Sequence, residues 1–317
     1  MRKSMIAIVI LVGTSLIAAT CIAAQQQKFI SVEGSSLAAK LEAAQTRAAN
    51  SGGAYWLAYS FDVRPNVGFD VDFSGADETS QPRVVSGATG EHETRNLGVF
   101  MLHQGSGGGG APARVEVYNL SRQRDFKETP VYWLGRAATP ESLGLLRRLV
   151  AQASNETAAG NLTDAIALHD DPQAASMLGE LLSNAPQEGV RSKAAFWLGR
   201  IPGHLQRLAD VVGNQREALS VRKQAVMAIG KSREAASGTT LQRLYSSGLS
   251  RDLKAEILDA AAKNRQGPTV DLLNTVAQND NDADLRSRAQ AHLNKAVGKK
   301  EKSKSDKQQN KPSKSSM

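Results

Sequence analysis

The chain has 317 residues, of which 41% are hydrophobic, 22% charged and 5% aromatic, and it contains a single cysteine. This composition supplies a sizeable core and excludes a wholly disordered chain, a collagen-like chain and a disulfide framework. The formal net charge is +8, but residues 1–3 contribute +2 and residues 298–317 contribute +5, which leaves +1 for residues 4–297. A basic folded domain of the kind that binds DNA or RNA is therefore not expected, and nucleic acid is an unfavoured partner.

Residues 1–24 have the pattern of an export signal. Two basic residues precede a mostly apolar, uncharged run over residues 5–24, and a polar stretch follows. The pattern is typical of a cleaved signal peptide and predicts a periplasmic or secreted protein. Two alternatives stay open: residues 5–24 are long enough to be kept as a membrane anchor, and Cys21 could carry a lipid, although the residues before it match the usual lipidation motif poorly. Cleavage after Ala24 would remove the only cysteine, and any cysteine chemistry with it.

Residues 25–126 are predicted to form a small β-containing module with one helix. Residues 35–50 have the apolar spacing of an amphipathic helix. The apolar period then changes to two, and strands are predicted at residues 54–63, 67–73, 83–85, 96–104 and 113–120. We expect a small antiparallel sheet that covers the N-terminal edge of the next domain. The glycine-rich run at 105–110 lacks the Lys-Ser/Thr pair of a phosphate-binding loop and is predicted to be a hairpin loop.

Residues 127–297 contain an internal repeat of 31 or 32 residues. The sequence Val-Tyr-Trp-Leu-Gly-Arg at 131–136 returns as Ala-Phe-Trp-Leu-Gly-Arg at 195–200. The small residue of this block recurs at positions 135, 167, 199, 230 and 262, and Asn294 takes its place in the last unit. Within each unit the apolar residues have helical spacing in two stretches, separated by turn residues. Each unit therefore predicts a helical hairpin, and small residues at the repeated position would let neighbouring helices approach closely while the stack buries the apolar faces.

These Leu-Gly-Arg blocks, together with second helices that have Leu-x-x-Leu spacing at 145–149 and 241–244, resemble the HEAT-like repeat family in its short bacterial, phycobiliprotein-lyase-like form. The resemblance covers residues 127–297. It implies a mainly α fold, an α-solenoid of about six HEAT-like helical hairpins preceded by the small antiparallel β-containing module. It also implies a protein-binding scaffold, because similar families serve mostly in that role. A lyase would need a nucleophile to hold a chromophore, and the sequence places no cysteine for it.

Basic residues follow the small positions of the repeat and predict a cationic ladder that could bind a partner. The ladder comprises Arg136, Arg200, Lys231, Lys263 and Lys295, and Leu168 interrupts it. Neighbours would lie about 10 Å apart if adjacent helices pack at the usual distance. The alternative is structural, because a basic residue in the last turn of a helix interacts favourably with the helix dipole. A second basic column, at Arg191, Arg222, Lys254 and Arg286, is expected to pair with Glu188, Asp252 and Asp284.

The sequence predicts no catalytic, cofactor-binding or metal-binding residues, and no cofactor. The five histidines are scattered, and His169-Asp170-Asp171-Pro172 is the one cluster that invites a metal or acid–base site. Aspartate and proline favour helix starts, so we expect this cluster to be the turn between two helices.

The tail, residues 298–317, has no apolar period and is predicted to be disordered. Its lysines could bind an anionic envelope polymer or lipid headgroups, and they are Lys299, Lys300, Lys302, Lys304, Lys307, Lys311 and Lys314. The predicted function is an exported, non-enzymatic scaffold that binds another protein through the solenoid. Two alternatives stay open: an enzyme or enzyme accessory, lyase-like or hydrolase, with a site at the junction of the two modules, and an envelope-surface tether acting through the tail.

Overall fold

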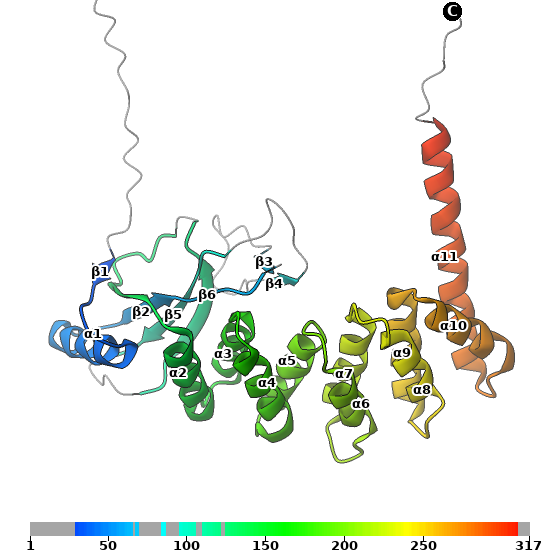
Figure 1. The fold of residues 1–317 in the computed structure, drawn as a ribbon, viewed down its shortest axis with the longest axis horizontal. Coiled ribbons are helices and arrows are strands. Elements are labelled where there is room, and N and C mark those ends of the chain that lie inside the picture. The colour runs from blue at the N-terminus through cyan, green and yellow to red at the C-terminus, as the bar shows by residue number, and fades with distance from the viewer. Residues whose placement is uncertain are drawn as a thin grey trace, which may run out of the picture.

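The computed structural model describes residues 29–65, 67–69, 84–86, 95–105, 110–121 and 124–309; in α11 only the backbone is described beyond residue 296. In this part of the chain, helices in two rows form an elongated solenoid beside a β-sheet module (Figure 1). The first row comprises α3 (Glu156–Leu168), α5 (Glu188–Leu198), α7 (Leu219–Lys231), α9 (Arg251–Asn264) and α11 (Ala283–Gln309). The second row comprises α2 (Thr139–Gln152), α4 (Pro172–Asn184), α6 (Leu205–Gly213), α8 (Ser237–Tyr245) and α10 (Gly267–Asn279). The predicted mainly α fold is confirmed.

Small residues set the spacing of the first row. A Cβ atom added to Gly199 would lie 2.6 Å from Cβ of Ala228 on the next helix, and one added to Gly230 would lie 2.7 Å from Cβ of Ala260. Ordinary carbon contacts are about 3.5–4.0 Å, so only glycine allows this approach. The predicted close packing at the repeated small position is therefore confirmed for α5, α7 and α9, whose facing residues are buried.

The N-terminal module is built on a five-stranded sheet. Its strands, in spatial order, are β1 (Ile30–Ser31), β7 (Val131–Arg136), β2 (Tyr55–Ser60), β5 (Leu97–His103) and β6 (Arg114–Asn119). A separate pair comprises β3 (Val67–Phe69) and β4 (Val84–Ser86), and α1 (Leu37–Ser51) packs against the large sheet. The sheet is mixed rather than antiparallel, because β7 pairs in parallel with both β1 and β2. The predicted helix and all five predicted strands are present, although the part of strand 67–73 beyond residue 69 lies outside the described residues.

The structure corrects the first unit of the repeat, because residues 131–136 form β7 and not a helix. Pro130 disfavours helix before it, Val131 and Tyr132 suit a strand, and the position between β1 and β2 supplies hydrogen-bond partners on both sides. Trp133 therefore stacks on Phe29 in the sheet module, with ring centroids 5.6 Å apart, whereas its repeat counterpart is buried in α5. The solenoid begins with α2, and the first predicted hairpin has a strand in place of its first helix.

The remaining glycine of the repeated position has a different role from the one predicted. Gly135 has φ +78°, in the left-handed region that favours glycine, and it is the next-to-last residue of β7 rather than a spacer between two helices. A Cβ atom there would meet only the Lys40 ammonium group, at 3.4 Å. The identical Leu-Gly-Arg sequences at 134–136 and 198–200 thus use glycine for backbone conformation in one case and for helix approach in the other.

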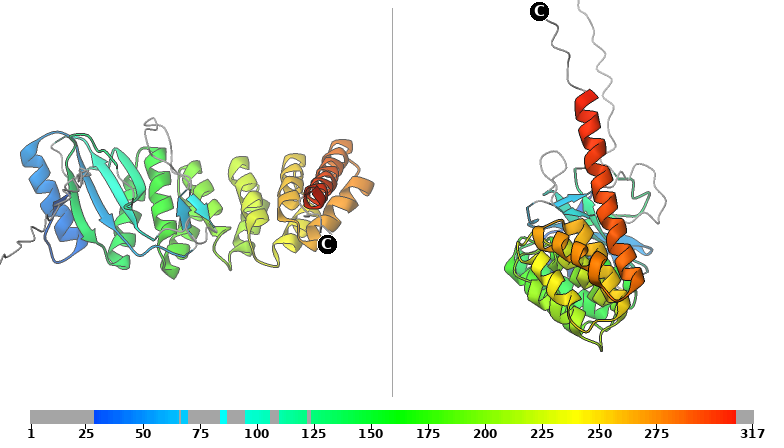
Figure 2. Two further views of the ribbon diagram at one scale, coloured as in Figure 1. Left: turned by 90° about the horizontal axis from the view of Figure 1, so that it is seen from above. Right: turned by 90° about the vertical axis from the view of Figure 1, so that its right-hand side faces the viewer.

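Helix α11 corrects the boundary of the tail. The helix continues to Gln309, so the backbone of residues 298–309 is helical where disorder was predicted. Extension of a packed helix avoids the cost of nucleation, and lysine, glutamate and glutamine are good helix formers. The 27 residues of α11 span about 40 Å, and the helix projects beyond the other helices of the solenoid (Figure 2). The tail's lysine side chains lie outside the described residues.

The predicted export signal, residues 1–24, also lies outside the described residues. Among the residues that the structure does describe, no helix has the length and apolar character needed to cross a membrane. Export, anchoring through residues 5–24 and lipidation of Cys21 therefore stay predictions.

Candidate functional site

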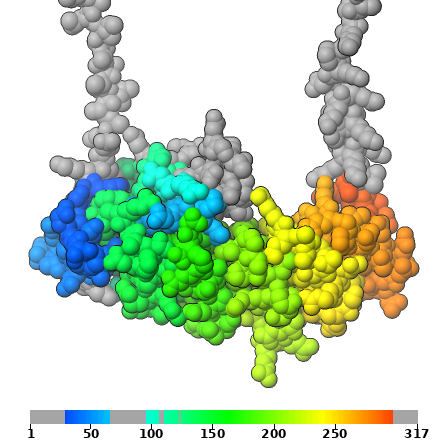
Figure 3. Space-filling model, viewed as in Figure 1, coloured from blue at the N-terminus to red at the C-terminus, as the bar shows by residue number. Residues whose placement is uncertain are grey.

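The cationic ladder maps onto one edge of the solenoid. The helices of the first row are parallel, so their C-terminal ends share an edge, the upper one in Figure 1. Arg200 lies two residues after the end of α5, Lys231 ends α7 and Lys263 lies in the last turn of α9. In the space-filling view this is the upper edge, between the sheet module and the last helices (Figure 3). We refer to Arg200, Lys231, Lys263 and Lys295 as the cationic row.

Like charges gather within this row. The pKa of Lys231 is lowered first by burial and then by the positive charges of Arg200 and Lys263. Arg200 is held in place, because its guanidinium carbon lies 3.4 Å from the ring centroid of Phe196 and its Nη1 donates to the Phe196 carbonyl at 2.8 Å. Burial lowers the pKa of Arg200 to about 10, so it is positively charged at neutral pH.

The acidic groups near the row are engaged elsewhere. In the described part of the chain, Lys231, Lys263 and Lys295 have no carboxylate within ion-pair distance. Glu234, in the loop after α7, accepts a hydrogen bond from the Gly203 backbone N–H at 3.1 Å. Asp259, one turn before Lys263, pairs with other side chains on α11. Lys231, Lys263 and Lys295 are therefore exposed lysines without a carboxylate partner among the described residues.

Two predicted members of the ladder, Arg136 and Lys295, lie in different parts of the fold. Arg136 lies at the end of β7 and forms an ion pair with Asp62, so it belongs to the sheet module and not to the row. Its assignment to the ladder was wrong because residues 131–136 are not a helix. Lys295 is exposed on α11, at the repeat position that follows Lys263. Leu168 interrupts the row as predicted, because it is buried where α3 meets the sheet module.

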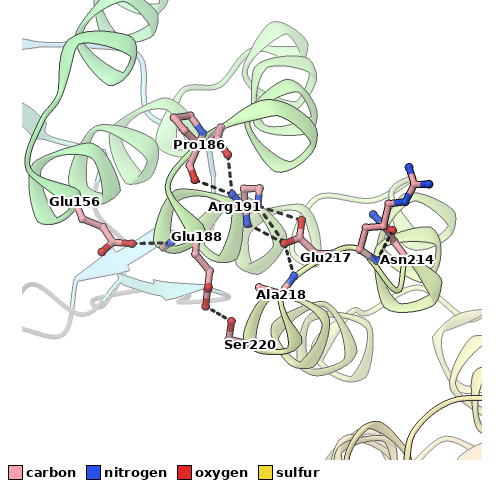
Figure 4. Close-up of polar contacts among 11 residues, drawn as sticks. Glu156, Pro186, Glu188, Arg191, Asn214, Glu217, Ala218 and Ser220 are labelled. Carbon is pink, nitrogen blue, oxygen red and sulfur yellow. Dashed lines mark hydrogen bonds and ion pairs between the residues drawn. The ribbon is translucent and has the colours of Figure 1, made fainter.

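The opposite edge of the solenoid carries a column of acidic residues, a feature that our sequence reasoning missed. Positions 156, 188, 220, 252 and 284 recur every 32 residues in the first turn of each first-row helix, and all but Ser220 are acidic. The backbone N–H of Gly189 donates to Glu156 Oε1 at 2.8 Å, and Glu188 accepts from Ser220 (Figure 4). Acidic residues stabilise helix N-termini, and here each one also joins neighbouring units. Aligning the sequence at a period of 32 would have revealed this column.

The second basic column is structural, as the sequence favoured, although its partners differ from the predicted carboxylates. Arg191 donates through Nη1 to the carbonyls of Ala185 and Pro186, at 2.8 and 3.0 Å, and pairs with Glu217 at 2.9 Å (Figure 4). Equivalent bonds connect Arg222 to the carbonyl of Val212 and Arg286 to that of Asp280. These arginines satisfy carbonyls at the C-terminal ends of second-row helices. They are therefore not available to a partner.

A buried polar chain joins the sheet module to the solenoid. Ser142 Oγ lies 3.0 Å from the Tyr59 hydroxyl oxygen and 2.8 Å from His169 Nε2. His169 Nδ1 lies 2.8 Å from the Ala165 carbonyl, and the ring stacks on Phe61 with centroids 4.2 Å apart. Burial lowers the pKa of His169 to about 4, so the imidazole is neutral at pH 7. A serine–histidine pair can activate a nucleophile, but Ser142 and His169 are 0% and 1% exposed, and substrate has no access to them.

The predicted turn at 169–172 is confirmed, because Asp171 caps α4 by accepting from the Gln173 backbone N–H at 2.7 Å. The turn also makes backbone hydrogen bonds with the segment after β2, including Asp170 N–H to the Asp62 carbonyl at 3.0 Å. In the part of the chain that the structure describes, three or more metal-binding side chains do not gather anywhere. This cluster is therefore a junction between the two modules.

Comparisons with known proteins add little beyond the architecture. No protein-family model matches the chain, and no curated protein matches it. The chain is similar to a solved structure, the complex of CpcE and CpcF of phycocyanin lyase from Nostoc sp. PCC7120, with 19% identity and a TM-score of 0.37 over 48% of this chain and 98% of that one. A likeness at this level bears on neither the activity nor the partner of this protein. The fold and the site define a helical-repeat protein with a mixed-sheet module and one cationic edge.

Proposed function

We propose that this protein is a scaffold that binds another protein through the cationic row of its solenoid. The observation that carries the proposal is that Lys231, Lys263 and Lys295 are exposed on successive first-row helices and have no carboxylate within ion-pair distance in the described part of the chain. Like charges held together gain from a partner of opposite charge, and electrostatic complementarity directs protein association. The arginines of the other basic column are already engaged with the protein's own carbonyls, which makes this edge the better candidate.

The proposal is tested by photo-crosslinking in intact cells. A photoreactive amino acid is placed at Ala235, an exposed loop residue on the edge of the row, or at Gln215, an exposed loop residue on the opposite edge of the same unit. We expect a discrete crosslinked protein from position 235 and none, or a different one, from position 215. Equal crosslinking from both positions, or none from 235, would contradict the proposal.

We also propose that the protein acts outside the cytoplasm, on the sequence pattern of residues 1–24. The mature N-terminus, determined by mass spectrometry, tests this. A chain that begins after Ala24 supports a periplasmic or secreted protein, and an intact chain supports an anchor through residues 5–24. A chain that begins at a lipid-modified Cys21 supports a lipoprotein.

The observations favour the two alternative functions, an enzyme site and a tether, unequally. An enzyme site at the junction of the modules finds no support in the described residues, because Tyr59, Ser142 and His169 close that junction. A tether through the tail is favoured by one observation, the projection of α11 beyond the solenoid, which carries the backbone of residues 298–309 away from it (Figure 1). The measurement is binding to vesicles that contain anionic lipid, with and without residues 298–317. Binding that is unchanged by the deletion would exclude the tether.

A further inference from the structure

Hydrogen bonds hold the loop after α7 against the loop after α9. Asn264 donates through Nδ2 to the Gly230 carbonyl at 3.0 Å and to Ser237 Oγ at 2.9 Å. Gln266 donates through Nε2 to the Glu234 carbonyl at 3.3 Å. These bonds join the C-terminal ends of two neighbouring first-row helices and the turns that follow them. The side chains that the two loops expose therefore belong to one surface.

Four basic residues surround these bonds. Lys231 and Arg233 belong to the end of α7 and its loop, and Lys263 and Arg265 to the end of α9 and its loop. All four are exposed, and we refer to them as the basic patch. The pKa of Lys231 is lowered first by burial and then by the positive charges of Arg200 and Lys263, so the charges of the two loops act on each other.

The basic patch has no partner within the described part of the chain. Its four side chains make no hydrogen bond, ion pair or ring contact with any described residue. Glu234 is the one acidic residue in either loop, and its carboxylate accepts from the Gly203 backbone N–H at 3.1 Å, in the preceding unit. Four positive charges are thus held together by the packing of the loops, with no compensating carboxylate.

Arg265 occupies a position that favours glycine. Its φ is +57°, in the left-handed region, and it directly follows α9. Glycine and asparagine are the common residues at such a helix end, because a larger side chain is strained there. The helix dipole attracts a cation, but Lys263 already supplies one in the last turn. An arginine that opposes its backbone preference and contacts nothing in its own chain points to a role in binding.

We propose that the basic patch binds an acidic segment of the partner protein, whose aspartate or glutamate carboxylates bridge the two loops. The inference rests on the proposed function, because it specifies the chemistry of the partner and adds Arg233 and Arg265 to the contact surface. Arginine donates two parallel hydrogen bonds to a carboxylate, which suits such a segment. Single-stranded nucleic acid is less favoured, because residues 4–297 together carry +1 and phosphate backbones require many cationic contacts.

The test measures binding of a synthetic peptide to the purified full-length protein by fluorescence anisotropy. Glutamate alternates with serine in the acidic peptide, and glutamine replaces glutamate in the control peptide. Binding is measured at about 20 and about 200 mM salt, since surface electrostatics are screened at the higher concentration. We expect the acidic peptide to bind and to weaken with salt, and the glutamine peptide not to bind.

A double variant shows whether the basic patch is the site. Arg233→Gln/Arg265→Gln should weaken binding of the acidic peptide by about 5-fold, since exposed ion pairs each contribute modestly. The matched control Arg148→Gln/Arg216→Gln removes the same charge at exposed positions away from the patch and should bind normally. The lysines of the tail are the same in both variants, so the difference between the two reports the patch alone. Thermal unfolding followed by circular dichroism verifies that both variants are folded.

The single variant Arg265→Gly separates binding from stability. Glycine adopts a φ of +57° without strain, so the urea unfolding midpoint should equal or exceed that of the wild type. Binding of the acidic peptide should nevertheless weaken by about 2-fold. A lower midpoint would overturn the inference, because Arg265 would then stabilise its own chain.

Other results would also overturn the inference. They are equal binding of the two peptides and equal binding by the Arg233/Arg265 variant and its control. A larger effect of the Arg233/Arg265 variant on binding of an oligonucleotide, or of vesicles with anionic lipid, would assign the patch to a different ligand. If position 235 captures the same partner in cells from the variant as from the wild type, the inference fails and the proposed function stands. If position 235 captures nothing, both fail.

Discussion

Substituting Gly230 by alanine tests whether the first-row helices pack as closely as described. The new Cβ would lie 2.7 Å from Cβ of Ala260 and 3.1 Å from both its Cα and its carbonyl oxygen. Reaching an ordinary carbon contact requires α7 and α9 to separate locally by about 0.8 Å. Overpacking of this kind costs about 1–3 kcal/mol, and the better helix propensity of alanine returns at most about 1 kcal/mol. We expect a net loss of about 1–2 kcal/mol in the free energy of unfolding.

The matched control is Gly144→Ala in α2. Gly144 also lies within a helix, but its nearest obstacle is the end of the flexible Arg148 side chain at 4.0 Å. Helix propensity then acts alone, and the substitution should stabilise the protein by about 0.5–1 kcal/mol. Urea unfolding followed at 222 nm measures both variants, and the midpoints are compared with the wild type because a repeat protein need not unfold in one step.

The sign of the change in the unfolding midpoint of Gly230→Ala decides whether α7 and α9 are in close contact. If Gly230→Ala raises the unfolding midpoint as much as Gly144→Ala does, α7 and α9 are not in contact at this position. The close packing of the first-row helices at the repeated small position would then lose its basis.

Three further predictions concern polar contacts. His169 has a pKa of about 4 in the folded protein, below its ordinary value of 6.5, so the unfolded chain takes up the proton first and the free energy of unfolding should fall as the pH drops from about 6.5 to 4. The loss should reach about 2 kcal/mol at pH 5, and His169→Gln should lack most of it when urea titrations at pH 7 and pH 5 are compared. Arg191→Ala should lower the free energy of unfolding by about 2 kcal/mol, because Glu217 and two carbonyls lose their contacts with the guanidinium group. In the same titrations, Arg191→Lys should recover less than half of this loss. Trp197→Phe should cost about 1–2 kcal/mol by removing the indole hydrogen bond to Asp164, and a variant as stable as the wild type would show that this 2.7 Å bond contributes nothing.

Local patterns were sufficient to predict most of the helical part. The 32-residue period, the helical spacing of apolar residues and the small residues at 199 and 230 all report interactions between neighbours in the chain or in the next unit. Such contacts recur in every unit, so one misread position does not alter the rest. The turn at 169–172 was predictable for the same reason, because Asp171 and Pro172 act within their own helix start.

The cationic row was predicted in part. Arg200, Lys231 and Lys263 follow the small positions, and the structure gathers them at one edge. Arg136 was included wrongly, because its place depends on the pairing of β7 with distant strands. The chain of Tyr59, Ser142 and His169 left no signal in the sequence, since Ser142 lies 83 residues after Tyr59 and 27 before His169 and the three have no motif in common.

The sequence alone determined that this protein is a stack of helical hairpins, because each unit repeats the same local choices of helix, turn and small residue. The tertiary structure decided what the two Trp-Leu-Gly-Arg sequences become. Residues 133–136 lie in a strand and residues 197–200 at the end of a helix, although the four residues are identical. A four-residue block has no conformational preference strong enough to choose, so the open position between β1 and β2 determines one outcome and the preceding turns of α5 determine the other.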